Sequence, residues 1–507
     1  MSKKSKTPSF IAELPLQVSQ EEQKMLLKRF EVGRFFYNAC LGEALKRLNR
    51  LRQSREFQKA KQEKDKKEKT SCFRALKKRF EFEEYALHSY ATRLSHSYLG
   101  EHLDSNTSQK LATRAFNAVE KILFGKAQKV RFKGKTQLSS LEGKSNDSGI
   151  RFKENSLIWG HLKLAAKIPK NDEVVEYALK KPIKYVRLVK RILNGKIYFY
   201  AQLVLKGIPF VKKKHKSRKK GSVGLDLGPS TIATVSKHSA QLKTFCKEID
   251  FKDKQTRQLK RKLERERRAN NPHNYKENGM IEKGKKEWVN SKRYLKTKQQ
   301  IAEIERKLAS QRKTLHGEEV NKILKTGNRF CFEKLSYKAW QKIWGKSILR
   351  RAPGFFIKRL QRKAESAGFE VCEFSTRSTK LSQRCQCGIL KKKPLSLREH
   401  RCPCGVYAQR DLYSAYLAQF VDQDYSFHAD QAIVAWSSAD SLLRTVWEKT
   451  YQTASVSLLR NSFGNPNFQR QSRSSAESKN PQSEAKNAVA SIPQVDGESL
   501  RQLWLFP

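Results

Sequence analysis

The chain has 507 residues, enough for several domains with a sizeable core. Lysine and arginine number 106 against 49 aspartates and glutamates, which gives a formal net charge of +57. A fold with this charge repels itself unless it binds a polyanion, so the composition predicts a nucleic-acid partner. It disfavours a membrane-surface protein, because the chain shows no basic helix with a clean apolar face.

Residues 1–19 are expected to supply a first strand, over Phe10 to Val18, before Ser19 and Glu22 form a capping box that begins a helix. Apolar residues then recur at helical spacing for most of the next hundred residues. We therefore expect a basic helical lobe over residues 20–128, although such a charged surface is also compatible with a solvated face that binds nothing.

From 129 to 207 the periodicity changes from helical to alternating, and Asn194-Gly195 between two apolar runs predicts a type I′ hairpin. A strand, a group of helices and then more strands predict one β-barrel that the helical lobe interrupts. The pairs Arg131-Phe132 and Arg151-Phe152 suit backbone contacts combined with base stacking. Such pairs are also common on ordinary strand surfaces.

Residues 208–220 form a basic linker, and the apolar segment GSVGLDLGPSTIATVS then opens an α/β domain expected over 221–375. Residues 252–315 are highly charged and mostly helical, so we expect a helical hairpin within this domain. Apolar residues within 409–460 predict further packed helices. The Ser-, Asn- and Gln-rich segment 461–507 is predicted to be disordered.

Nine cysteines divide into two groups. Five are scattered singly, which suits buried reduced thiols: Cys40, Cys72, Cys246, Cys331 and Cys372. The other four are clustered, a pattern that fits a reducing compartment and one metal site better than a disulfide framework. The N-terminal MSKKSKTPSF lacks a signal-peptide core, and no apolar run approaches the roughly 18 residues of a membrane span. We therefore expect a cytoplasmic, nucleoid-associated prokaryotic protein.

Cys385 and Cys387 form one close pair, Cys402 and Cys404 form a second, and a glycine follows each. Four thiolates so arranged suit tetrahedral Zn²⁺. Both pairs are one residue shorter than the usual Cys-x-x-Cys, so a metal-free hairpin, or His400 as a substitute ligand, stays an alternative. The basic residues expected to contact DNA around the cluster are Lys391 to Lys393, Arg398 and Arg401.

Three acidic residues stand out by their surroundings. Asp226 lies in the middle of an apolar strand, Glu333 follows another, and Asp411 begins a helix. Each alone has an ordinary explanation: a buried ion pair, a strand-end salt bridge and a helix N-cap, respectively. Carboxylates at two strand ends and on one helix can nevertheless converge. Together they would suit the two Mg²⁺ ions, about 3.5–4 Å apart, that hydrolyse phosphodiesters.

Three segments resemble the RuvC motifs of the TnpB family, in the family's order: Gly224-Leu-Asp226-Leu-Gly228-Pro-Ser-Thr-Ile-Ala, Phe332-Glu333-Lys-Leu335 and Gln409-Arg410-Asp411-Leu-Tyr-Ser-Ala. TnpB proteins are encoded by insertion sequences and are related to compact type V CRISPR effectors. The resemblance covers the chain to about residue 420. It implies a multidomain α/β protein in which a wedge-type β-barrel with a helical recognition lobe precedes an RNase H/RuvC-like nuclease domain. A zinc-ribbon-like insert is then expected at 376–408, before the third motif.

The resemblance implies a transposase-associated, RNA-guided endonuclease that cuts double-stranded DNA matched to a guide RNA from its own element. The implied ligands of two catalytic Mg²⁺ are Asp226, Glu333 and Asp411. The implied ligands of a structural Zn²⁺ are the four clustered cysteines. Two positions depart from the family: Gln409 replaces an aspartate, which we expect to tune activity, and Tyr413 replaces an asparagine near Asp411.

Four alternatives remain at this stage. The first is an RNA-guided DNA-binding protein without cleavage, which the three acids disfavour, and the second is a type V CRISPR effector of the same architecture. A transposase that moves the element itself would need a His-x-His pair, which the sequence lacks. A purely structural RNA-binding protein would explain the charge but not the acids.

Overall fold

The computed structural model describes residues 8–212, 220–249, 253–284, 286–394, 396–453 and 463. They form two compact units, divided after Phe210. Both units mix helices with sheets, so the expected α/β class is confirmed, while most of the segment 461–507 that was expected to be disordered, and 213–219 of the linker, lie outside the described residues. No helix in the described ranges combines the length and apolarity needed to cross a bilayer.

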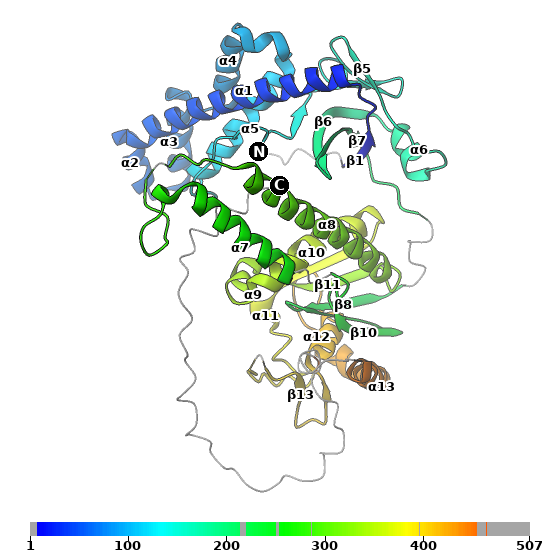
Figure 1. Ribbon diagram of the computed structural model, residues 1–507. Helices are drawn as coiled ribbons and strands as arrows, with labels where there is room; N and C mark the ends of the chain where they lie inside the picture. Colours follow the sequence, from blue (N-terminus) through cyan, green and yellow to red (C-terminus); the bar gives the residue numbers. More distant parts are fainter. Residues whose placement is uncertain are drawn as a thin grey trace. The chain divides into compact units, whose positions relative to one another are not determined.

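The first unit contains strands and helices in this order: β1 (Ser9–Pro15), α1 (Gln20–Gln53), α2 (Arg55–Gln62), α3 (Lys66–Arg79), α4 (Glu84–Ser95), η1 (Tyr98–His102), α5 (Ser105–Leu123), β2 (Ser140–Glu142), β3 (Arg151–Lys153), β4 (Ser156–Trp159), β5 (Leu162–Ala165), α6 (Glu173–Leu179), β6 (Ile183–Leu193) and β7 (Lys196–Lys206) (Figure 1). One sheet has the order β1-β7-β6-β2 and a second has the order β3-β4-β5. A bridge between Leu16 and Ala166 links the end of β1 to the end of β5.

Two local predictions for this unit are confirmed. Ser19 and Glu22 form both hydrogen bonds of a capping box at the start of α1. Asn194 and Gly195 have φ values of 49° and 79° and join β6 to β7 through a two-residue turn, as a type I′ hairpin requires. The alternating pattern that begins at residue 129 predicts strands from there onward, but the structure has no strand at residues 129–135.

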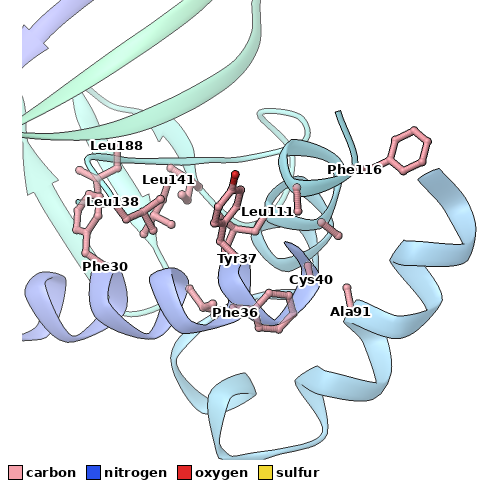
Figure 2. Packing of buried hydrophobic residues seen from close by; sticks show 14 of the residues in the cluster. Phe30, Phe36, Tyr37, Cys40, Ala91, Leu111, Phe116, Leu138, Leu141 and Leu188 are labelled. Carbon is pink, nitrogen blue, oxygen red and sulfur yellow. The ribbon is translucent and has the colours of Figure 1, made fainter. Parts of the chain in front are cut away.

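The helices and strands of the first unit share one core. Figure 2 shows α1 side chains such as Phe30 and Phe36 packed with Leu111 of α5, Leu141 of β2 and Leu188 of β6. Phe152 is buried in this core, whereas Phe132 is exposed. Of the two Arg-Phe pairs suggested for base stacking, the pair at 151–152 is therefore wrong, because its ring faces the interior.

The second unit begins with β8 (Ser222–Leu227), β9 (Thr231–Ser236) and β10 (Ser239–Thr244), and continues with α7 (Asp253–Asn270), η3 (Pro272–Asn274), α8 (Lys292–Ile323), β11 (Arg329–Lys334), α9 (Tyr337–Arg351), α10 (Pro353–Ser366), β12 (Glu370–Ser375), α11 (Thr376–Thr379), β13 (Glu399–Arg401), β14 (Tyr407–Gln409), α12 (Arg410–Ala418) and α13 (Ala429–Thr453) (Figure 1). Its main sheet has the order β10-β9-β8-β11-β12. The first three strands are antiparallel, whereas β8, β11 and β12 are parallel neighbours.

The main sheet is covered on both faces. On one face, apolar residues of β8 and β11 pack with Phe356 and Leu360 of α10 and Val320 of α8. On the other face, Cys331 of β11 packs with α12, and the last helix α13 adds the buried Trp447. Burial on both faces explains why β8 and β11 have nearly continuous apolar sequences. It also leaves the strand ends as the place where polar side chains can gather.

Candidate metal centres

Asp226 and Glu333 lie side by side at the carboxyl ends of two parallel strands. The last paired residues of β8 and β11 are Leu225 and Phe332, and each acid comes one residue later. Side chains alternate along a strand, and neighbours in register point to the same face of a sheet. Both carboxylates therefore point to one face, and this edge of a parallel sheet is where ligand sites are usually built.

Helix α12 brings Asp411 to the same end. A Cβ added to Gly224 would lie 1.8 Å from the backbone oxygen of Ala415, so the helix and β8 are in direct contact at this glycine. Asp411 lies one helical turn before Ala415, and Asp226 lies two residues beyond Gly224. Each step is about 6 Å. Both steps lead toward the same end of the sheet, because Thr231, at the turn between β8 and β9, lies 3.3 Å from Asp411 Oδ2.

The carboxylates repel one another in a partly dehydrated setting. Burial, then the charges of Asp411 and Glu333, raise the pKa of Asp226 well above its usual range, although two arginines nearby act in the opposite direction. Burial raises the pKa of Glu333 to about 7, while a hydrogen bond from the backbone of Leu381 lowers it. A cation bound among such acids would stabilise their ionised forms, so this arrangement favours a metal site.

The chemistry of this donor set fits Mg²⁺, which prefers oxygen ligands on rigid elements. Within the described ranges, the four clustered cysteines are the only group with three or more possible ligand atoms within 4.8 Å of one another. The three carboxylates are therefore not arranged closely enough to bind one ion together.

Three residues around Asp411 were not assigned a role there from the sequence. Thr231 Oγ1 donates a hydrogen bond of 3.3 Å to Asp411 Oδ2. Arg398 lies 3.8 Å from Asp411 Oδ2, and the side chain of Arg410 lies 3.5 Å from Oδ1. Arg398 was expected only to contact DNA, but its nearest described anionic group is this carboxylate. The motif segment from Gly228 to Thr231 was the available signal for Thr231, whereas Arg398 reaches Asp411 only through the tertiary fold.

The four predicted thiols come together as a second centre. Sγ of Cys385 lies 3.5 Å from that of Cys404, and Sγ of Cys387 lies 3.4 Å from that of Cys402. All four sulfurs lie within 4.8 Å of one another. These separations are far longer than a disulfide bond and are close to the edges of a tetrahedron with Zn–S of about 2.3 Å. The donor set therefore fits Zn²⁺.

Both short cysteine pairs form the same tight turn. Gly388 and Gly405 have φ values of 90° and 91°, which side chains other than glycine rarely adopt. In each turn the glycine N–H donates to the backbone oxygen of the first cysteine, at 3.0 and 3.1 Å. The backbone N–H of Ile389 and Val406 also donates to Cys387 and Cys404, respectively, which stabilises the thiolate forms. Each Cys-x-Cys pair is one residue shorter than the usual Cys-x-x-Cys, but it still forms the backbone hydrogen bonds that stabilise the thiolates.

His400 lies outside the thiol cluster. Its Nδ1 contacts Lys393 Nζ, and its ring packs on Tyr413 with centroids 4.3 Å apart. The structure therefore gives no support to His400 as a ligand within the four-cysteine group. Among the scattered cysteines, Cys72 is exposed and the other four are buried, so the expectation of burial is wrong for Cys72.

No protein-family model matches the chain, and no curated protein matches it. Among solved structures, a chain of the Cas12f1–sgRNA–target DNA complex is similar, with a TM-score of 0.40 and 11% identity over 81% of this chain and 98% of that chain. A chain of the CRISPR-Cas12f ternary complex has a TM-score of 0.28 and 12% identity over 80% and 83% of the two chains. A functional assignment rests on the residues of the site, because similarities at this level are weak.

Proposed function

We propose that this chain is a metal-dependent nuclease. Asp226, Glu333 and Asp411 form the site at which it hydrolyses phosphodiester bonds. The observation that carries this proposal is the placement of the acids: Asp226 and Glu333 each follow the last paired residue of two parallel strands, and α12 contacts β8 at Gly224. The raised pKa of Asp226, whose causes include the charges of the other two acids, agrees with this placement. Three acids from distant parts of the sequence meet at the carboxyl end of two parallel strands. A purely structural RNA-binding protein has no need for such an arrangement.

The three acids would hold two Mg²⁺ ions, which supply an activated water and a stabilised leaving oxygen when bound. Thr231 orients Asp411 by donating to its Oδ2. Arg398 and Arg410 flank the same carboxylate and would attract the phosphate of the substrate. Ions bound among the acids would also reverse the destabilisation of the ionised carboxylates, so ion binding and deprotonation are coupled.

The substrate and the guide are inferred from the sequence. The resemblance to TnpB motifs supports RNA-guided cleavage of double-stranded DNA, and the net charge of +57 supports binding of both RNA and DNA. In this scheme base pairing reads the target sequence and the protein binds the backbone. A CRISPR type V context for the same activity is the second candidate, and the neighbouring genes distinguish the two.

The test is to purify the chain with its bound RNA, sequence that RNA and supply a plasmid that matches it. With Mg²⁺, the complex is expected to cut the matched plasmid and to leave a scrambled plasmid intact. An Asp226→Asn variant is expected to keep the RNA and lose cleavage. Retained RNA with no cleavage by the unsubstituted complex would instead favour an RNA-guided binding protein.

A further inference from the structure

Helix α9 carries three exposed lysines that no acidic side chain of the described residues neutralises. It has five basic residues and no acidic one, and Lys338, Lys342, Lys346 and Arg350 recur every fourth residue. Residues at this spacing lie along one side of a helix, about 6 Å apart. The helix bends at Trp344, whose φ of −117° and ψ of 37° are not helical, so Lys338 and Lys342 lie before the bend and Lys346 lies after it. The three lysines are exposed, and no carboxylate of the described residues pairs with any of them. This lysine row places positive charge toward solvent on both sides of the bend.

A row of aromatic rings lies along the same helix. The ring centroids of Tyr337 and Trp340 are 6.0 Å apart and those of Trp340 and Trp344 are 5.7 Å apart, both edge to face. Both tryptophans are partly exposed, and Ile343 beside them is 68% exposed. The first ring of the row, that of Tyr337, packs closely on the backbone of Gly354. A Cβ added to Gly354 would lie only 2.9 Å from this ring.

Helix α9 is fixed beside the carboxylates. It begins four residues after Glu333, and Ser347 Oγ donates a hydrogen bond of 2.6 Å to the backbone oxygen of Pro229. Pro229 belongs to the turn that follows Asp226 and β8. At the far end of the helix, Arg351 Nε donates to the backbone oxygen of Phe245 at 2.8 Å. The cationic and aromatic rows therefore start at the edge of the sheet where the acids lie.

We propose that α9 is the surface that receives an unpaired nucleic-acid strand next to the carboxylates, with phosphates on the lysine row and bases on Trp340 and Trp344. This inference rests on the proposed function, because it names how the strand to be cut is held. Lysines beside partly exposed aromatic rings are the combination that binds single strands without reading their sequence. A duplex fits less well, because its bases are stacked and paired and cannot lie on the tryptophans.

A membrane surface is the main competing partner for a basic helix with apolar residues. Such a helix would place its whole apolar side at the bilayer. In α9 the apolar Ile348 is buried and Tyr337 is packed against Gly354, so only part of that side is free. The observations therefore favour the nucleic-acid strand.

The test measures the affinity of the full chain for two fluorescent 20-mers, oligo(dT) and a fully abasic strand of the same charge. All proteins carry Asp226→Asn, so the strands stay intact and binding is measured whether or not the chain is a nuclease. Trp340→Leu with Trp344→Leu is expected to weaken oligo(dT) binding at least about tenfold and abasic binding less than about twofold. Replacing Lys338, Lys342 and Lys346 by Gln is expected to weaken both strands and to reduce the slope of log K against log salt by about 2.

Controls carry changes of the same kind elsewhere: Tyr85→Leu for one exposed aromatic ring, and Lys64→Gln, Lys66→Gln and Lys67→Gln for three exposed charges. The proposal is overturned if the tryptophan variant binds oligo(dT) as its control does, or loses equal affinity for both strands. It is also overturned if that variant loses binding only to phosphatidylglycerol vesicles.

A second measurement needs no substitution in α9, so it does not depend on the folding of the variants. Photo-crosslinking to a strand of bromodeoxyuridine, followed by trypsin digestion, is expected to label peptides 339–342 and 343–346, which contain the two tryptophans. Labelling confined to other peptides would contradict the proposal even if the variants bind weakly. Failure of the proposed nuclease would leave both binding results unchanged and would be seen only as missing cleavage.

Discussion

The hydroxyl group of Tyr413 lies 3.4 Å from Sγ of Cys385, and the backbone N–H of Gln386 donates to the same hydroxyl at 3.0 Å. Tyr413 is almost fully buried on α12, two residues after Asp411. One side chain thus joins the helix that carries a proposed catalytic acid to the first turn of the thiol cluster. The position where the family's asparagine is missing has a structural role in this chain.

Tyr413→Phe is expected to loosen this connection. It leaves the buried N–H of Gln386 without its acceptor, which costs about 1–3 kcal/mol. A lower melting temperature and faster loss of Zn²⁺ to a competing chelator would show this. Tyr416→Phe is the matched control, because its hydroxyl is also buried on α12 but donates to Ala432 rather than to the cluster. Equal rates of zinc loss from the two variants would rule out the connection.

The thiol cluster is expected to contribute directly to the stability of the second unit. Cys402→Ser removes one of four ligands, and it is predicted to release Zn²⁺ and to lower the melting temperature by at least about 5 °C. Atomic absorption and thermal unfolding measure the two effects. Cys72→Ser, at an exposed cysteine of the first unit, is the control and is expected to change neither. Full zinc content in the Cys402 variant would contradict a four-thiolate site.

Gly224 is predicted to tolerate no side chain. In Gly224→Ala the new methyl group would meet the backbone of Ala415 at 1.8 Å, so α12 must move away from β8. We expect a loss of about 3 kcal/mol in the free energy of unfolding, together with weaker Mg²⁺ binding as Asp411 shifts. Gly42→Ala is the control: its Cβ meets only the Phe132 ring at 3.8 Å, and a helical alanine adds about 0.5–1 kcal/mol. Similar unfolding curves for the two variants would refute the close contact.

The pH dependence of stability is expected to report on Glu333. Burial raises its pKa to about 7 from the ordinary value of 4.5, so folding binds a proton between these values. Without divalent ions, the contribution of this group to stability is present below the lower value and is lost as the pH rises through about 7, by on the order of 1–3 kcal/mol. Glu333→Gln cannot titrate, so its advantage in melting temperature over the unsubstituted protein is expected to grow with pH. A constant difference between pH 5 and 8 would argue against a carboxylate whose pKa is raised by burial.

Much of the candidate site could be predicted from the sequence because its residues are of types that are unusual for the segments in which they lie. Asp226 interrupts an apolar strand, and four cysteines cluster within twenty residues of a chain where cysteine is rare. These features are local. The contact of Arg398 with Asp411 is not, because it depends on how the segment around β13 packs against α12.

The fold shows the same division. The capping box at Ser19 and the hairpin at Asn194-Gly195 are set by a few adjacent residues, and both were predicted. Phe152 faces the interior from β3, whereas Phe132 lies outside any strand and is exposed; the alternating sequence around both residues does not show this difference. The four-residue spacing of the lysines in α9 was visible in the sequence, but its meaning depends on where the helix lies.

The most direct test of the account is the number of Mn²⁺ ions that the chain binds, measured by electron paramagnetic resonance. If the three acids hold two ions, a spin-coupled pair is expected, and it is lost in Asp226→Asn, Glu333→Gln and Asp411→Asn alike. Glu370→Gln is the control, since Glu370 lies at the opposite end of the same sheet with Asp422 nearby. A pair that survives the first three changes, or disappears only in the Glu370 variant, would show that the three acids do not form the metal centre.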